Sequence, residues 1–151
     1  MKAAQRKEIT TDEAQIRAIV EDYGEGLRTK DVERCVSHYA DDVVQFNLAP
    51  PLEFRGKETV KKNLSEWFKT FTGPIDIEIK SLEISAGADT AFAYSFNRIG
   101  GTKTNGESTP HWVRVTIGFQ KTDGEWLVNH EHVSVPFYMD GSFRAAVDLK
   151  P

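Results

Sequence analysis

The sequence predicts an α+β domain whose first half is mainly helical and whose second half forms an antiparallel sheet around a small pocket. Before Gly73, most apolar residues recur at helical spacing, whereas from Ile75 onward they alternate with polar residues. Gly73-Pro74 separates the two regions with a strong helix stop. Short turns such as Asp123-Gly124 join the later segments and favour antiparallel hairpins.

Length and composition fit one globular domain. The chain has 151 residues, of which 39% are hydrophobic and 28% charged, and its net charge is -4. This mild acidity argues against nucleic-acid binding, which needs clustered Lys and Arg. The single cysteine, Cys35, excludes an internal disulfide, and no apolar run reaches the length of a membrane span. We therefore expect a cytoplasmic, single-domain protein over residues 1–151, with flexible tails at 1–9 and 139–151.

Three helices are predicted in the first half. Thr10 and Glu13 have the spacing of a capping box, with Thr10 as the N-cap of the first helix. Asp31 can cap a short second helix, and Gly56 precedes a third. Their apolar stripes are, in turn, Ile16, Ile19, Val20, Tyr23 and Leu27; Val32, Cys35, Val36 and Tyr39; and Val60, Leu64, Trp67, Phe68 and Phe71.

The remaining elements are predicted to be strands. Residues 43–48 form one strand between the second and third helices, and Pro50-Pro51 marks a loop after it. After Gly73, the alternation changes parity near Ser81, which indicates a bulge. Further strands are expected at 91–99, 111–121 and 125–137. One sheet face can pack on the helices, and a second copy of the chain would cover the other, so we expect a homodimer.

Six short segments, in this order, resemble the nuclear transport factor 2-like superfamily, and specifically its SnoaL-like and ketosteroid isomerase-like subgroup. The segments are Tyr23, Lys30-Asp31-Val32, Tyr39–Val43, Phe54–Glu58, Lys121–Val128 and His130–Ser134. The resemblance implies a cone-shaped fold with three N-terminal helices packed on a curved mixed, mostly antiparallel sheet, a pocket between them, and a dimer. The same fold is used by polyketide cyclases and by the association domain of calmodulin-dependent kinases.

The resemblance also assigns roles. Tyr23 matches the helix tyrosine that, in the steroid isomerases, donates a hydrogen bond to the substrate oxygen. Asn47 falls where these enzymes keep an aspartate base, and asparagine cannot accept a proton near neutral pH. Near the place of their protonated aspartate, the chain has Val113, Val115 and Thr116 and no carboxylate. Steroid isomerase chemistry in its known form is therefore not expected.

The last strand supplies the other candidates for the pocket. If Trp126 and Val128 face the helices, plain alternation places His130, His132 and Ser134 on the pocket wall. His132 is then the candidate acid or base, because its ordinary pKa lies near neutrality. Its partner in catalysis would be Tyr23 or Asn47, as a hydrogen-bond donor to a developing oxyanion. The residues predicted to contact a ligand are Phe46, Trp67, Trp112, Arg114, His130 and Ser134.

Structural roles are alternatives for the same residues. His132 can be a core histidine bonded to Tyr23 or Ser134, and the Tyr23 ring can serve ordinary helix packing. Arg114 can form an ion pair with Glu125 or Glu131 across a strand.

A metal site is a further alternative, with His130 and His132 joined by a third ligand such as His111. No third ligand has an obvious spacing, and cupin barrels, which use such a histidine pair, lack a helical first half. We therefore expect no metal, and no glycine loop indicates a nucleotide cofactor.

Two functions remain open. The first is a cofactor-independent isomerase, cyclase or dehydratase that uses His132 on a small apolar or aromatic molecule. The second is a non-catalytic small-ligand-binding or oligomerisation domain, because one scaffold can host both.

Overall fold

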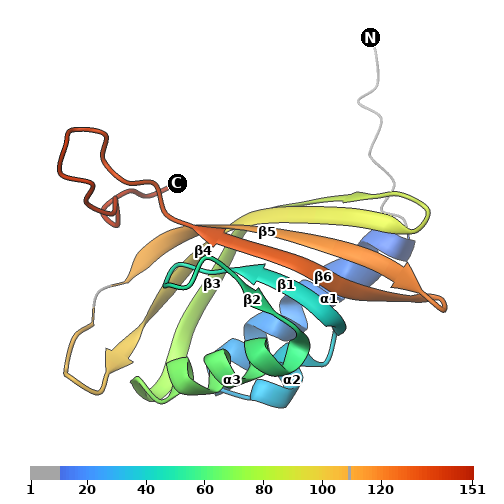
Figure 1. The fold of residues 1–151 in the computed structure, drawn as a ribbon, viewed down its shortest axis with the longest axis horizontal. Coiled ribbons are helices and arrows are strands. Elements are labelled where there is room, and N and C mark those ends of the chain that lie inside the picture. The colour runs from blue at the N-terminus through green and yellow to red at the C-terminus, as the bar shows by residue number, and fades with distance from the viewer. Residues whose placement is uncertain (1–10, 109) are drawn as a thin grey trace, which may run out of the picture.

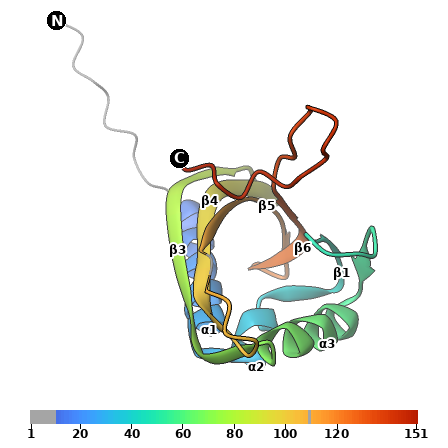
Figure 2. The same ribbon diagram turned by 90° about the vertical axis from the view of Figure 1, so that its left-hand side faces the viewer.

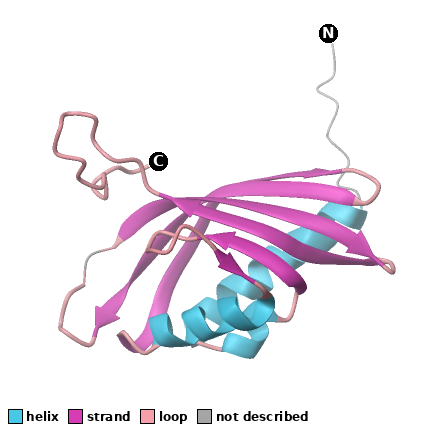
Figure 3. Ribbon diagram, in the orientation of Figure 1, coloured by secondary structure: helices cyan, strands magenta, loops and turns pink. Residues whose placement is uncertain are grey.

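The computed structural model describes residues 11–108 and 110–151. The helices lie on one side of a curved sheet (Figure 1, Figure 3). The elements are α1 (Thr11–Thr29), α2 (Val32–Val36), β1 (Tyr39–Phe46), β2 (Phe54–Arg55), α3 (Lys57–Phe68), β3 (Phe71–Ala86), β4 (Thr90–Lys103), β5 (His111–Thr122) and β6 (Glu125–Ser134).

The six-stranded sheet has the order β2-β1-β6-β5-β4-β3. β1 runs parallel to β6, and the other neighbouring strands are antiparallel. Figure 2 shows the sheet curling over the interior, with α2 and α3 on the side that the sheet leaves open. The predicted α+β fold, with three helices and a curved, mixed and mostly antiparallel sheet, is confirmed.

Two helix predictions can be followed in detail. The Asp31 side chain accepts a hydrogen bond from the Arg34 backbone N–H at 3.1 Å, so Asp31 is the N-cap of α2 as predicted. The predicted N-cap of α1, Thr10, lies outside the described residues. Near the end of α1, a Cβ atom on Gly26 would lie 2.8 Å from the Cys35 Sγ atom. Glycine at this position therefore allows α1 and α2 to approach closely.

Two residues predicted to continue helices begin strands instead. Tyr39 starts β1, where it pairs with Val128 of β6, and α2 ends before it. Phe71 starts β3 and pairs with Lys103. In both cases a strand partner that is distant in sequence overrides a helical spacing that was only local.

The strand boundaries also differ from the prediction. β4 continues past residue 99, where the predicted strand ends, to Lys103, so Gly100 and Gly101 lie within the strand. Gly101 has a φ angle of 120°, and a Cβ atom there would lie 3.3 Å from the Phe71 ring. β6 ends at Ser134 rather than at residue 137.

The register of strand pairing shifts at four places in the sheet, and two of them bear on the sequence predictions and the site. The predicted bulge near Ser81 is confirmed, because the register of β3 on β4 shifts between Lys80 and Glu83 and Ser81 has a φ angle of 57°. A second, unpredicted shift lies in β6. Val128 pairs with Phe119 and His130 pairs with Gly118, so Asn129 is an extra residue without a partner on β5.

After β6, the chain forms a hydrogen-bonded turn. The Ala146 backbone N–H donates to the Pro136 carbonyl at 2.8 Å, and the Tyr138 hydroxyl donates to the Asp148 carboxylate at 2.6 Å. Ala146 is buried, and Val147 reaches the cavity described below.

Candidate functional site

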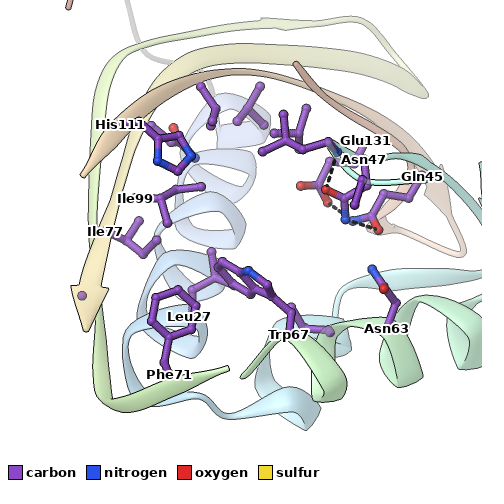
Figure 4. Close-up of a pocket in the computed structure, with 18 of the residues that line it drawn as sticks. Leu27, Gln45, Asn47, Asn63, Trp67, Phe71, Ile77, Ile99, His111 and Glu131 are labelled. Atoms are coloured by element: carbon purple, nitrogen blue, oxygen red, sulfur yellow. Dashed lines mark hydrogen bonds between the residues drawn. The ribbon is translucent and has the colours of Figure 1, made fainter. Parts of the chain in front are cut away.

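A cavity of about 490 Å³ lies between the inner face of the sheet and helices α1 and α3. Figure 4 shows it with Leu27, Trp67 and Phe71 on one side and Glu131, Asn47 and Gln45 on another. Most of the remaining wall is aliphatic, contributed by Leu64, Ile77, Ile99, Val113, Val115 and Val133. Its size and apolar lining suit a small organic molecule.

A buried carboxyl group interrupts this apolar wall. Glu131 is only 3% exposed. Its carboxyl group accepts hydrogen bonds from the Tyr39 hydroxyl at 2.5 Å and from the Gln45 amide at 3.3 Å. A third donor, the Tyr23 hydroxyl, lies at 3.5 Å. Asn47 extends this hydrogen-bond network, because its amide donates to the Gln45 side-chain oxygen at 3.3 Å. We call these five residues the Glu131 cluster.

Three elements bring the Glu131 cluster together. Gln45 of β1 lies directly beside Glu131 of β6 in the parallel pair, so both side chains point to the inner face. Tyr39 and Asn47 come from the same chain segment as Gln45, at its two ends. Tyr23 reaches the cluster from α1, and its ring stacks on that of Tyr39 with centroids 6.0 Å apart.

Burial controls the electrostatics of the cluster. Removal of water raises the pKa of the Glu131 carboxyl group, and this outweighs the opposite effect of its three hydrogen-bond donors. Burial, together with the nearby Glu131 carboxylate, holds the pKa values of Tyr23 and Tyr39 well above their usual range. The two tyrosines therefore stay protonated and donate, whereas the proton of Glu131 is retained to a higher pH than usual.

This arrangement can transfer protons. A carboxyl group with a raised pKa is a stronger base when ionised and holds its proton closer to neutral pH than an ordinary glutamate. The Asn63 amide of α3 points into the cavity toward Gln45 and Asn47 (Figure 4) and provides a further polar contact. The Glu131 end of the cavity therefore combines an acid–base group with several hydrogen-bond donors.

Three of the predicted site residues line the cavity, namely Tyr23, Asn47 and Trp67. Their roles stay predictions. The bond between Tyr23 and Glu131 replaces the predicted alternative in which Tyr23 bonds to His132.

The predicted orientation of the other six site residues is wrong. Phe46, Trp112, Arg114, His130, His132 and Ser134 all lie on the outer face of the sheet, away from the helices. Trp126 and Val128 do face the interior, as expected. The extra residue Asn129 then reverses the alternation, so that Glu131 and Val133 point inward.

The outer-face residues contact one another. The Phe46 ring packs edge-on against the rings of His130 and His132, with centroids 4.7 Å and 5.4 Å apart. The His130 Nδ1 atom lies 2.7 Å from the Val44 carbonyl oxygen. Arg114 donates to the Ser134 hydroxyl at 3.1 Å, rather than forming the alternative ion pair with Glu125 or Glu131.

The possible metal ligands do not converge. His111 lines the cavity, whereas His130 and His132 lie on the opposite face of the sheet. Within residues 11–108 and 110–151, the structure contains no group of three or more side chains of the kind that binds a metal ion.

Sequence reasoning missed the centre of the cluster. Tyr39 was assigned to a helix, and Glu131 was assigned to the outer face of the last strand. One signal was present: Gln45 and Asn47 alternate with apolar residues in the predicted strand, so their side chains lie on the same face. Two polar side chains on one face of an apolar strand indicate a polar region there. Nothing local identified Glu131 as their partner.

Comparison with known proteins agrees with the fold. The family model of the SnoaL-like domain matches residues 16–138, and the chain belongs to this family. A nuclear transport factor 2-like protein of unknown function from Pseudomonas putida KT2440 is 34% identical, with a TM-score of 0.86 over 95% of this chain and 100% of that chain. Among curated proteins, none matches the chain closely enough to count as a relative.

Two more distant structures share the fold alone. A ketosteroid isomerase-like protein from Erwinia carotovora atroseptica SCRI1043 is 24% identical, with a TM-score of 0.72 over 83% of this chain and 96% of that chain. A proposed dehydratase of the nuclear transport factor 2-like family from Streptomyces avermitilis is 19% identical, with a TM-score of 0.73 over 85% and 99% of the two chains. In the described part of the chain, no helix is both long and apolar enough to cross a membrane.

Proposed function

We propose that the cavity binds a small apolar or aromatic carbonyl compound and that Glu131 moves protons on it without a cofactor. The reaction class is that of an isomerase, cyclase or dehydratase. The observation that carries this proposal is the buried Glu131 carboxyl group, which lines an apolar cavity and has three hydrogen-bond donors around it. Glu131 takes the role that the sequence suggested for His132, because His132 lies on the outer face.

The chemistry uses Glu131 as a base and then as an acid. Its carboxylate takes a proton from the carbon beside the ligand carbonyl, and the electron pair of that C–H bond forms the C=C bond of an enolate. Negative charge moves to the ligand oxygen, where Asn63 and Tyr23 can donate hydrogen bonds. Tyr23 is suited to this role because its 3.5 Å contact with Glu131 is the longest in the cluster. In a ligand with a β,γ C=C bond, the enolate extends to the γ carbon, and return of the same proton to that carbon moves the double bond and completes an isomerisation.

Proton exchange in D₂O tests this function without knowledge of the natural substrate. β-Tetralone, a flat apolar ketone, exchanges its α-protons for deuterium when a base removes them, and NMR follows the loss of signal. We expect Glu131→Gln to lower the enzyme-dependent exchange rate at least about 100-fold, the contribution of a positioned acid or base. The matched variant His132→Gln should keep the rate within about twofold, because an exposed side chain outside the cavity contributes little.

Equal rates for the wild type and Glu131→Gln would contradict the acid–base role. An unchanged Glu131→Gln rate combined with a large loss in His132→Gln would return the role to the histidine.

The competing function is retention of a small ligand without turnover. Among the described residues, every buried polar side-chain atom already has a hydrogen-bond partner, so the Glu131 cluster is complete without a substrate. Under this function, the wild type would not accelerate the exchange of β-tetralone. The ketone would still raise the melting temperature, because a ligand that binds only the folded state stabilises it.

We also propose that the outer face of the sheet pairs with a second copy of the chain. Three aromatic residues stand in a row on β4: Phe92 is 49% exposed, Tyr94 is 52% exposed and Phe96 is 39% exposed. A row of this kind is typical of an interaction surface. Sedimentation should show that Tyr94→Arg dissociates the dimer, whereas Thr122→Arg at the β5–β6 turn does not. A wild-type monomer at micromolar concentration would exclude this pairing.

A further inference from the structure

A lysine lies at the opposite end of the cavity from the Glu131 cluster. Lys103 is the last residue of β4, and it lines the cavity where Phe71 and Trp67 form the wall. Its ammonium nitrogen lies 3.8 Å from the centroid of the Phe71 ring and 5.6 Å from that of Trp67. The aromatic residues therefore hold the cation at the cavity rather than in open solvent.

The Lys103 ammonium group has unused hydrogen-bonding capacity. It donates to the Thr70 hydroxyl at 2.9 Å, which uses one of its three N–H donors. Within the described residues, it forms no ion pair. Burial lowers the pKa of Lys103, and the carboxylate of Glu107 opposes this effect. An anion that accepted hydrogen bonds from the two remaining N–H groups would replace the water that the partly buried ammonium group has lost.

Glu107 is the acidic side chain nearest to this site in sequence and also lines the cavity. It is exposed and belongs to the segment between β4 and β5, whereas Lys103 is part of the sheet. The backbone N–H of Lys103 donates to the Glu107 carbonyl at 2.8 Å, and the Glu107 carboxylate also acts on the Lys103 ammonium group through its charge. Lys103 is thus the cation at this end of the cavity, and a bound anion would take the place of the exposed Glu107 carboxylate, whose charge is screened by solvent.

The strand register places the two charged groups far apart along the cavity. Glu131 pairs with Ile117, which pairs with Ala93 near the start of β4. Lys103 lies at the other end of the same strand. Between these levels, the wall is mostly aliphatic, with Ile99, Val113, Val115 and Val133, and the polar side chains of Asn97 and His111 interrupt it. In Figure 4, Phe71 and Trp67, whose rings contact Lys103, lie on one side of the cavity, and Glu131 and Gln45 lie on the other.

We propose that the ligand is an elongated carboxylic acid. Its carboxylate binds the Lys103 ammonium group, its apolar body lies along the aliphatic wall, and its other end carries the oxo or hydroxyl group that reaches the Glu131 cluster. The assignment of that other end rests on the proposed function, whereas the assignment of the carboxylate to Lys103 does not. The substrate class is thus narrowed from apolar carbonyl compounds to oxo or hydroxy acids.

Calorimetry with decanoate and decanol tests the carboxylate site, because the two probes share a chain and differ in charge. We expect the wild type at neutral pH to bind decanoate at least about tenfold more tightly than decanol, as a charge-assisted hydrogen bond would provide. Lys103→Met should lower decanoate affinity about tenfold and leave decanol affinity within about twofold. Lys103→Arg should restore most of the loss, and Lys62→Met, on the exposed face of α3, should change neither affinity.

Equal affinity of the wild type for both probes would overturn the inference. So would an unchanged decanoate affinity in Lys103→Met, or an equal loss in Lys62→Met. Decanoate carries no carbonyl group at its far end, so Glu131→Gln should bind it within about twofold of the wild type. A failure of the proton-exchange experiment therefore leaves this result intact, and a failure here leaves the role of Glu131 intact.

Discussion

Neighbouring residues on β6 lie in opposite environments. Glu131 points to the inner face, is 3% exposed and is surrounded by three hydrogen-bond donors. His132 follows directly, points to the outer face and is exposed beside the Phe46 ring. By side-chain chemistry alone, the histidine is the better candidate for acid–base work at neutral pH. The face of the sheet, rather than the residue type, decides which group meets the cavity.

One unpaired residue sets this difference. Asn129 has no partner on β5, and its insertion reverses the alternation of every later residue of β6. Without the bulge, a regular strand of the same sequence would turn His130 and His132 inward and Glu131 outward. A single bulge therefore exchanges a histidine site for a glutamate site without any change in side-chain identity.

The largest expected contrast between the two faces concerns stability. Phe119 of β5 is fully buried, whereas Phe92 of β4 is 49% exposed on the outer face. We expect Phe119→Ala to lower the free energy of unfolding by about 3–5 kcal/mol through loss of apolar burial and a cavity. Phe92→Ala should lower it by less than about 1 kcal/mol at low protein concentration. Urea denaturation monitored by tryptophan fluorescence measures both values.

The concentration dependence sharpens this contrast. If the outer face pairs two copies, the loss in free energy of unfolding caused by Phe92→Ala grows as the protein concentration rises. The loss caused by Phe119→Ala does not depend on contact between two copies, because Phe119 lies in the core. Similar losses at low concentration would contradict the assignment of the two faces.

The next contrast is the pH dependence of stability. The folded state raises the pKa of Glu131 above its ordinary value of 4.5, so folding favours the protonated carboxyl group. This contribution is fully present below pH 4.5 and is lost as the pH rises through the folded-state value. Glutamine cannot ionise. The stability of Glu131→Gln relative to the wild type should therefore increase with pH, by about 1.4 kcal/mol for each unit of the raised pKa.

Urea denaturation of both proteins from about pH 4 to about pH 8 measures this difference. A constant difference would mean that the donors cancel the effect of burial. A difference that changes in favour of the wild type as the pH rises would mean that the donors outweigh burial and lower the pKa of Glu131.

The smallest expected effect comes from removal of the extra residue itself. Deletion of Asn129 makes the pairs Phe119–Val128 and Gly118–His130 consecutive, and Glu131 still points inward. We expect a loss of about 1 kcal/mol, within the range of ordinary single mutations. The pH-dependent stability difference that Glu131→Gln causes should persist when the substitution is made in the deletion variant. Its disappearance would show that the bulge is needed to hold Glu131 in the cavity.

The fold could be predicted because its signals are local. The change from helical spacing to alternation at Gly73 separates the helical half from the sheet half, and the parity change at Ser81 revealed one bulge. The capping of α2 by Asp31 depends on residues three positions apart. Each of these features is determined by neighbours within one turn or one strand.

The site could be predicted only in part, because it depends on pairing between distant segments. Tyr23 and Asn47 were placed at the pocket by family resemblance, and both line the cavity. Glu131 was missed because Asn129 carries no residue-type signal of a bulge, in contrast to a glycine at a turn. Tyr39 was missed because its helical spacing from Val32 was as good as its fit to a strand.

The parallel pairing of β1 with β6 has a consequence for how the chain folds. The hydrogen bonds from Gln45 and Tyr39 to Glu131 join residues 86 and 92 positions apart, whereas β3 to β6 follow one another through short connections. Closure of a long loop is entropically expensive, so we expect the hairpins to assemble first and β1 to dock last. Until that moment Glu131 stays hydrated. A chain that stalls before the docking of β1 would have nearly all of its sheet and none of its buried acid.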